Sequence, residues 1–398
     1  MSVSTEMINW FELKLSGVGA SKKCNDMIQL KNLTVIIPTY ERQSYLLRQV
    51  LYWSDSPVTL IIVDGSKSPL MELQNLKMPG DMNFKYVHCQ ENFSNRLSLA
   101  GNMIKTPYAV MLGDDEFHLK GGLISAIDTL ANNASLSGCI GQSLEFSLIE
   151  SALKIGPGYS HNYYEVVEDK VSDRLNKAMV NYNTATCYAV MTKSAWTFSW
   201  GDIKAFSSPY AEELQQAMST YIHGKFTSIQ SVYWMRSFDE PLINILGEYD
   251  RTLSFNIWWK SQSYTHEKDE FVDRLAHKLF SEGGAESLDH AREILQTALK
   301  IYITDMDRPD SKNFLRSLLR KITVWIRGNS NFKFIEIINI WLSRFLFNAL
   351  RRRELNDFIS ITELELSDKK RAFDKTKILI TELKEIEQLV IEHRRYHR

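Results

Sequence analysis

The segment LTVIIPTYERQSYLLRQVLYWSDSPVTLIIV, which runs from Leu33 to Val63, reads as a strand, a helix and a second strand. Leu33–Ile37 is a β-branched apolar run that stops at Pro38, and Thr59–Val63 is a second such run. Between them, Tyr45–Trp53 carries apolar residues at helical spacing. Strands that are apolar throughout, rather than alternating, are typical of a parallel sheet covered on both faces. The segment therefore predicts an α/β fold.

The pattern continues on the C-terminal side of this segment. Leu70–Leu76 is a weaker helical stretch, Phe84–His88 a third strand, Phe93–Ile104 a helix and Tyr108–Leu112 a fourth strand. Further along we expect a strand at Thr184–Met191, a helix at Ala211–Gly224 and a strand at Thr227–Met235. Beyond residue 250 helical periodicity dominates. We expect a lead segment over 1–30, an α/β domain over 31–250 and a mostly α-helical C-terminal region over 251–398.

Composition excludes several classes of protein. The chain has 398 residues, and its 47 Lys and Arg nearly balance 48 Asp and Glu, so no global field favours a nucleic-acid partner. The four cysteines lack paired spacing, which argues against a zinc site or a disulfide framework and favours a reducing compartment. We expect a cytoplasmic protein, because neither a secretory signal nor a run of 18 apolar residues is evident.

Polar and acidic residues follow the predicted strands. Pro38–Tyr40 follow the first strand, Asp64 the second, His88 closes the third, and Asp114-Asp115-Glu116 follow the fourth. In an open α/β sheet, ligands bind beyond the carboxyl ends of the strands. Three adjacent carboxylates repel one another, so a cation or a substrate is expected at this edge.

The ordered set TVIIPTYERQSYLLRQVL, LIIVDGS, NRLSLAGNMIKTPYAVMLGDDEF and EEL resembles family-2-type glycosyltransferases of the GT-A (Rossmann-like) fold, over residues 31 to 240. The resemblance implies a nucleotide-sugar donor, with UDP-sugars as the first expectation. It places Pro38, Thr39 and Tyr40 around the nucleotide. Asp64 would contact the base, because Val63 stands where such families carry another acid. Arg96 matches an arginine that contacts the nucleotide.

The acidic triplet resembles the metal-binding Asp-x-Asp region of that family. The resemblance implies Mn²⁺ or Mg²⁺, held by Asp115 with Asp114 on the ribose or on metal-bound water. Such a cation would neutralise the diphosphate as it leaves. The strand has to turn at these residues, since in an extended segment Asp115 would point away from its neighbours. The alternative is a solvated turn whose acids favour a helix dipole.

An inverting transfer also needs a carboxylate base. The family supplies it at the start of a helix about eleven residues before a glycine, and counting back from Gly224 reaches Glu213, with Glu212 before it. We prefer Glu213. Dipole pairing alone would also explain both glutamates. Arg236 and Trp234 are candidates for the diphosphate and the acceptor sugar, although a strand with one core aromatic explains them equally well.

The segment Asn331–Arg353 is rich in aromatic and aliphatic residues and ends in three arginines. It is either a core helix, a dimer contact or an amphipathic helix on an anionic membrane surface, with packing the preferred interpretation. The C-terminal run KTKILITELKEIEQLVIEHRR has near-heptad spacing, which leaves homo-oligomer formation through C-terminal helices open.

The predicted function is an inverting, metal-dependent glycosyltransferase. Its acceptor would be a carbohydrate or lipid-linked hydroxyl, in the synthesis of surface polysaccharide, lipopolysaccharide or a glycoconjugate, with peripheral contact at the inner face of the cell membrane. Three alternatives remain. These are a retaining transferase on the same fold, a non-catalytic binding module, and a nucleotidyltransferase, for which PTYERQ lacks the expected glycine-rich loop.

Overall fold

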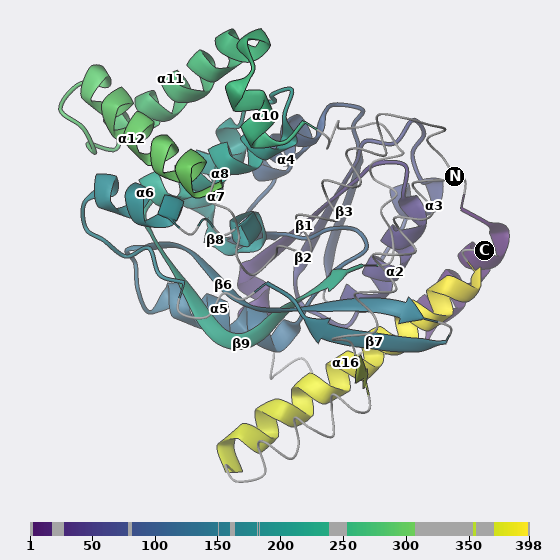
Figure 1. Cartoon of the computed structure of the whole chain (residues 1–398). Coiled ribbons are helices and arrows are strands. Elements are labelled where there is room, and N and C mark those ends of the chain that lie inside the picture. The colour runs from purple at the N-terminus through teal and green to yellow at the C-terminus, as the bar shows by residue number, and fades with distance from the viewer. Residues whose placement is uncertain are drawn as a thin grey trace.

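The structure is a computed structural model, and Figure 1 shows a mixed sheet with helices around it. It describes residues 3–17, 28–78, 82–149, 151–159, 164–180, 182, 184–238, 253–306, 353–355 and 370–396.

One half of the sheet is parallel. Its strands lie in the order β3 (Asn83–His88), β2 (Thr59–Asp64), β1 (Leu33–Thr39) and β4 (Tyr108–Met111). Strand β1 is buried along its whole length, as its unbroken apolar run predicted. The connecting helices are α2 (Gln43–Trp53), α3 (Met71–Gln74) and α4 (Phe93–Gly101). The predicted α/β fold, with a Rossmann-like parallel half, is confirmed.

The other half of the sheet is mixed. Strand β8 (Val190–Thr192) runs antiparallel to β4 and to the long β6 (Leu136–Ile149), which pairs in parallel with β9 (Lys225–Ser237). The remaining antiparallel pairs use β5 (Phe117–His118), β7 (Ala152–Pro157) and β10 (Arg353–Glu354). Helix α5 (Lys120–Ala131) follows β5 and packs against β6 and β9.

The strand predicted at Thr184–Met191 is wrong over its first half. Thr184–Tyr188 form a 3₁₀ helix, η2, and only Val190–Thr192 join the sheet. The hydroxyls of Thr186 and Tyr221 lie 2.6 Å apart, which fixes η2 against the neighbouring helix α8. Tertiary contacts thus override the β-propensity of this stretch.

A further set of helices packs beside the sheet. They are α6 (Val171–Val180), α7 (Lys193–Ser199), η3 (Trp200–Asp202), α8 (Pro209–His223), α10 (Phe255–Lys260), η4 (Gln262–Tyr264), α11 (Thr265–Ser281) and α12 (Leu288–Met306). Of these, α10, α11 and α12 lie at the top of Figure 1. Helices α11 and α12 pack together, and α11 also contacts α8. This confirms the predicted helical region after residue 250, while the segment Asn331–Arg353 lies almost wholly outside the described residues.

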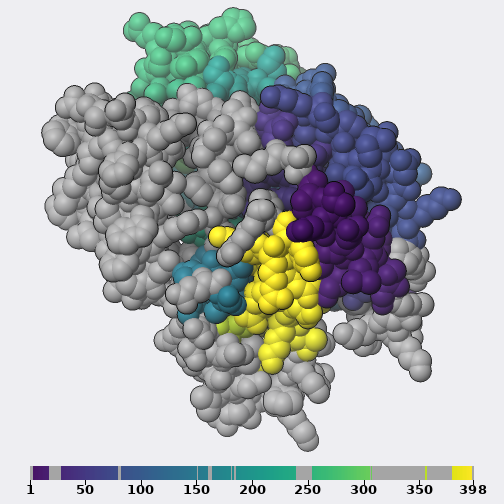
Figure 2. Space-filling view, turned by 90° about the vertical axis from the view of Figure 1, so that its right-hand side faces the viewer, coloured from purple at the N-terminus to yellow at the C-terminus, as the bar shows by residue number. Residues whose placement is uncertain are grey.

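Two helices from opposite ends of the chain cover α2. These are α1 (Thr5–Ser16) and α16 (Lys370–Tyr396), which lie side by side in Figure 2. Trp10 Nε1 donates to Glu392 Oε2 at 3.0 Å, which ties the two helices together. Glu382 on α16 accepts hydrogen bonds from Tyr52 Oη and from the backbone N–H of Lys120, both at 2.6 Å. Helix α16 therefore packs within its own chain and braces both α2 and the segment after β5.

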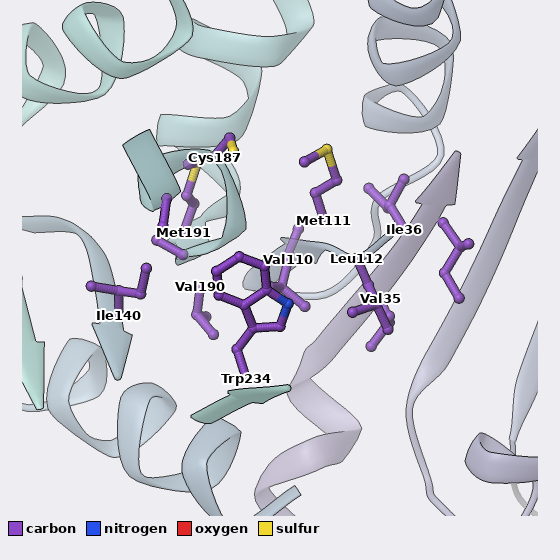
Figure 3. Packing of buried hydrophobic residues seen from close by; sticks show 14 of the residues in the cluster. Val35, Ile36, Val110, Met111, Leu112, Ile140, Cys187, Val190, Met191 and Trp234 are labelled. Atoms are coloured by element: carbon purple, nitrogen blue, oxygen red, sulfur yellow. The ribbon is translucent and has the colours of Figure 1, made fainter. Parts of the chain in front are cut away.

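Apolar side chains from both halves of the sheet meet in the core. Figure 3 shows Val35 of β1, Val110 of β4 and Val190 of β8 close to the indole of Trp234, with Ile36 of β1 farther away. This packing fixes β1, β4, β8 and β9 relative to one another, and with them the loops at their ends. Among the described residues, no helix has the length and apolar character needed to cross a membrane.

Candidate active site

A cavity of about 450 Å³ opens at the carboxyl ends of β1 and β4. Every site residue predicted from the sequence lines it, with the exception of Asp64. Its other walls come from η2, from the start of α8 and from the end of β9, and Tyr159 and Tyr188 are among the residues there. The fold therefore gathers in one cavity predicted site residues that are up to about two hundred positions apart in the chain.

The acidic residues lie on a turn between β4 and β5, as predicted. Helix α2 holds this turn by its backbone carbonyls. Arg48 Nη2 donates to the carbonyl of Asp115 at 2.8 Å, and Gln49 Nε2 donates to the carbonyls of Asp114 and Glu116 at 3.0 and 2.5 Å. Because both donors are buried, the turn is rigidly placed on α2.

The charge of the acidic turn is balanced by Arg42, which sequence reasoning missed. Its Nη2 lies 2.6 Å from Asp115 Oδ2 and 3.3 Å from Asp114 Oδ1. Asp114 Oδ2 also accepts a hydrogen bond from the Thr39 hydroxyl at 2.6 Å. Burial raises the pKa of Asp114 to about 6, against the lowering effect of Arg42. The turn thus carries less negative charge than three free carboxylates would.

Glu116 lines the cavity, is buried and is hydrogen-bonded to Trp234. The indole N–H of Trp234 donates to Glu116 Oε2 at 2.9 Å. Burial, with repulsion from Asp115, raises the pKa of Glu116 to about 8, so this carboxyl is largely protonated at neutral pH. The Trp234 ring stacks on Tyr188, with centroids 4.3 Å apart, and on Tyr159 at 6.0 Å. Trp234 thus stacks with both tyrosines, and the residue is 1% exposed.

Asp64 lies away from the cavity and is fully buried. Its Oδ1 accepts the N–H of Ser66 at 2.8 Å, and its Oδ2 accepts from Gln43 Nε2 and Tyr86 Oη at 2.6 and 2.5 Å. These bonds shape the turn that follows β2. The predicted contact of Asp64 with a base stays a prediction.

Arg96 crosses from α4 toward the loop after β1. Its guanidinium lies over Gly65 so closely that a Cβ there would be 1.3 Å from Nη1, which explains the glycine. The guanidinium carbon is 6.0 Å from the centre of the Tyr40 ring. Arg96 and Tyr40 are therefore neighbours in the cavity lining, and their predicted contacts with a nucleotide stay a prediction.

The two glutamates at the start of α8 differ in their surroundings. Glu212 is 2% exposed and bonded within the protein, since its Oε2 accepts from the Ser94 hydroxyl and its Oε1 from the N–H of Phe206 at 3.2 Å. Glu213 is only partly buried, and its Oε1 lies 3.5 Å from Tyr182 Oη. Both glutamates line the cavity, and Glu212 is the more buried of the two.

Arg236 lies on the rim beside Tyr159. Its Nη1 donates to Tyr159 Oη at 3.0 Å and lies 3.7 Å from Glu145 Oε1, and its guanidinium sits 5.1 Å from the Tyr159 ring centre. The two carboxylates Glu116 and Glu145, together with the two phenol groups nearby, raise the pKa of Arg236, although burial alone would lower it. The rim therefore presents a cation fixed against an aromatic ring.

The predicted Mn²⁺ or Mg²⁺ site stays a prediction. Among the described residues, no group of three or more His, Cys, Asp or Glu side chains is arranged to hold a metal ion. Magnesium keeps near-octahedral oxygen ligands. Here the two carboxylates predicted to supply them both face Arg42. As arranged, Asp114 and Asp115 fit a guanidinium rather than a metal.

Comparison with known proteins gives distant structural neighbours only. No family model matches the sequence, and no curated protein matches it. The chain is similar to the crystal structure of S. aureus TarS at 15% identity and a TM-score of 0.39. That match covers 69% of this chain and 54% of TarS, about half its length. The structure of S. aureus TarS 1–349 in complex with UDP-GlcNAc matches at 14% identity and a TM-score of 0.39, over 69% of this chain and 89% of that one.

Sequence reasoning missed Arg42, Tyr159 and Tyr188. A signal existed for Arg42, because it lies two residues after Tyr40 in a loop already assigned to the ligand edge. The two tyrosines carried no motif. They reach the cavity through the β7 end and η2, whose positions depend on tertiary packing.

Proposed function

We propose that this protein is an inverting glycosyltransferase that moves a sugar from a nucleotide-diphosphate sugar to a hydroxyl acceptor. The observation that carries the proposal is the cavity itself. Its lining includes Tyr40 and Arg96, the acidic turn and Glu213. Its volume of about 450 Å³ is in the range of small-ligand pockets.

The chemistry follows from these positions. The Pro38–Tyr40 loop and Arg96 hold the nucleotide, and Glu213 accepts the proton of the acceptor hydroxyl as its oxygen attacks the anomeric carbon. The bond from that carbon to the diphosphate oxygen breaks, and its electron pair leaves with the diphosphate. Attack from the side opposite the leaving group inverts the anomeric configuration. Arg236 and Tyr159 flank the acceptor side.

The experiment is donor turnover. The protein is incubated with UDP-, GDP- and CDP-sugars, with Mn²⁺ and separately with EDTA. Release of nucleoside diphosphate is followed, and the anomeric proton of the product, or of the free sugar formed with water as acceptor, is read by NMR. We expect one donor to be consumed with inversion, and Glu213→Gln to abolish its consumption. A folded wild-type protein that consumes no donor in either condition would favour the non-catalytic module, and retained configuration would favour a retaining transferase.

A further inference from the structure

Arg42, which contacts the acidic turn, follows a residue with a strained backbone, Glu41. Glu41 has a φ of 55°, the only positive φ outside glycine among the described residues. This left-handed conformation costs free energy for a residue with a side chain and calls for a compensating role. Two hydrogen bonds hold it, from the Glu41 N–H to Ser66 Oγ and from the Lys67 N–H to Glu41 Oε1, both at 2.8 Å. The strain directs the next residue, Arg42, toward Asp114 and Asp115.

The charged guanidinium of Arg42 is buried. The residue is 6% exposed, its guanidinium lies 4.7 Å from the Tyr45 ring centre, and Asp114 and Asp115 are its ion-pair partners. Burial alone would lower the pKa of Arg42, but the two carboxylates outweigh it and raise the pKa above its usual value. A buried ion pair costs desolvation free energy and contributes little net stability, so this pair points to a role in function.

The guanidinium also has donors to spare. Nε and Nη1 of Arg42 are buried and find no hydrogen-bond acceptor among the described residues, although Arg42 lines the cavity. An unsatisfied buried donor on a charged group costs more free energy than one on a neutral group. Phosphate oxygens are the acceptors that match the planar fork of arginine. A ligand phosphate that entered beside Arg42 and reached these two atoms would satisfy both donors.

We propose that Arg42, in place of a divalent cation, supplies the positive charge that binds and stabilises the leaving diphosphate. This inference rests on the proposed function and identifies Arg42 as the group that stabilises the charge of the leaving diphosphate. As the bond from the anomeric carbon to the phosphate oxygen breaks, the electron pair and its charge move onto the diphosphate, beside Arg42. The acceptor proton goes to Glu213, so charge and protons balance without a metal. Asp114 and Asp115 then hold the guanidinium in place.

The test is calorimetric titration of the free nucleoside diphosphates UDP, GDP and CDP, in EDTA and in Mn²⁺. We expect one nucleotide to bind the wild type in EDTA with a dissociation constant within about threefold of that in Mn²⁺. Arg42→Gln should weaken that binding by at least about tenfold in EDTA, as expected for losing hydrogen bonds to a charged group. Arg42→Lys, which keeps the charge without the fork, should fall between the two. Arg274→Gln is the matched control, because Arg274 pairs with Asp202 away from the cavity.

A second readout guards against misfolding of Arg42→Gln. Binding of Mn²⁺ to the protein without nucleotide is measured by electron paramagnetic resonance. We expect weak binding to the wild type and tighter binding to Arg42→Gln, which frees both carboxylates. Nucleotide binding that needs Mn²⁺ in the wild type would overturn the role of Arg42 and leave the proposed function standing. No binding of any nucleotide in either condition would instead overturn the proposed function.

Discussion

Exchanging the two adjacent glutamates of α8, one at a time, separates catalysis from structure. Glu213→Gln removes the proposed base and keeps the shape of the side chain. A general base contributes about 10²–10⁴-fold to a rate. That range equals about 3–5 kcal/mol of activation free energy. Because Glu213 is only partly buried, we expect its substitution to change the free energy of unfolding by less than about 0.5 kcal/mol.

Glu212→Gln should behave in the opposite way. Glu212 accepts from Ser94 on one oxygen and from the N–H of Phe206 on the other. Glutamine has a single acceptor oxygen, so one of these buried donors loses its partner, at a cost of about 1–3 kcal/mol.

The assays are the rate of donor consumption, the nucleotide dissociation constant and urea unfolding. We predict that Glu213→Gln loses the rate while keeping nucleotide affinity and stability, and that Glu212→Gln loses stability first. A Glu213→Gln protein that retains its rate within about threefold, beside a folded Glu212→Gln protein that has lost it, would move the base to Glu212.

Three further predictions concern the scaffold of the site. Burial lowers the pKa of His118 from 6.5 to about 4, so between these pH values the unfolded chain binds a proton that the folded chain does not. The free energy of unfolding should therefore fall by about 3 kcal/mol as the pH drops from 6.5 to 4. His118→Gln should flatten this slope when urea unfolding is measured at a series of pH values. Glu382→Ala should lower the free energy of unfolding by about 1–3 kcal/mol, because the N–H of Lys120 loses its acceptor, and unchanged urea unfolding would show that α16 does not brace this segment. Gly65→Ala should displace Arg96 and weaken nucleotide binding by about tenfold in a calorimetric titration. Unaltered affinity would show that Arg96 does not contact the nucleotide.

The strands and the polar edge of the sheet could be predicted because their signals are local. The apolar run Leu33–Ile37 is buried on both faces, and the turn at Asp114–Glu116 follows from three acids that cannot all stay in an extended strand. The start of α8 could be located because Glu212 and Glu213 stand at a fixed count before Gly224. Each of these inferences used residues close together in the chain.

The rest depended on contacts between distant segments. Propensity favoured a strand at Thr184–Tyr188, but packing against α8 made it a 3₁₀ helix. The position of Arg42 depends on the left-handed backbone of Glu41. A left-handed conformation is predictable where the residue is glycine or asparagine, and here it is a glutamate. An amphipathic pattern in α16 predicts a helix but not its partner, which is α2, more than three hundred residues earlier.

The measurement that tests the central claim most directly is the binding of a nucleoside diphosphate to the cavity. UDP, GDP and CDP are titrated calorimetrically into the wild-type protein and into an Arg96→Gln variant, each shown to be folded by urea unfolding. The account predicts saturable, one-to-one binding of one nucleotide by the wild type and weaker binding by the variant. Equal affinity in both proteins would place the nucleotide elsewhere, and no binding of any of the three to the wild type would contradict the account.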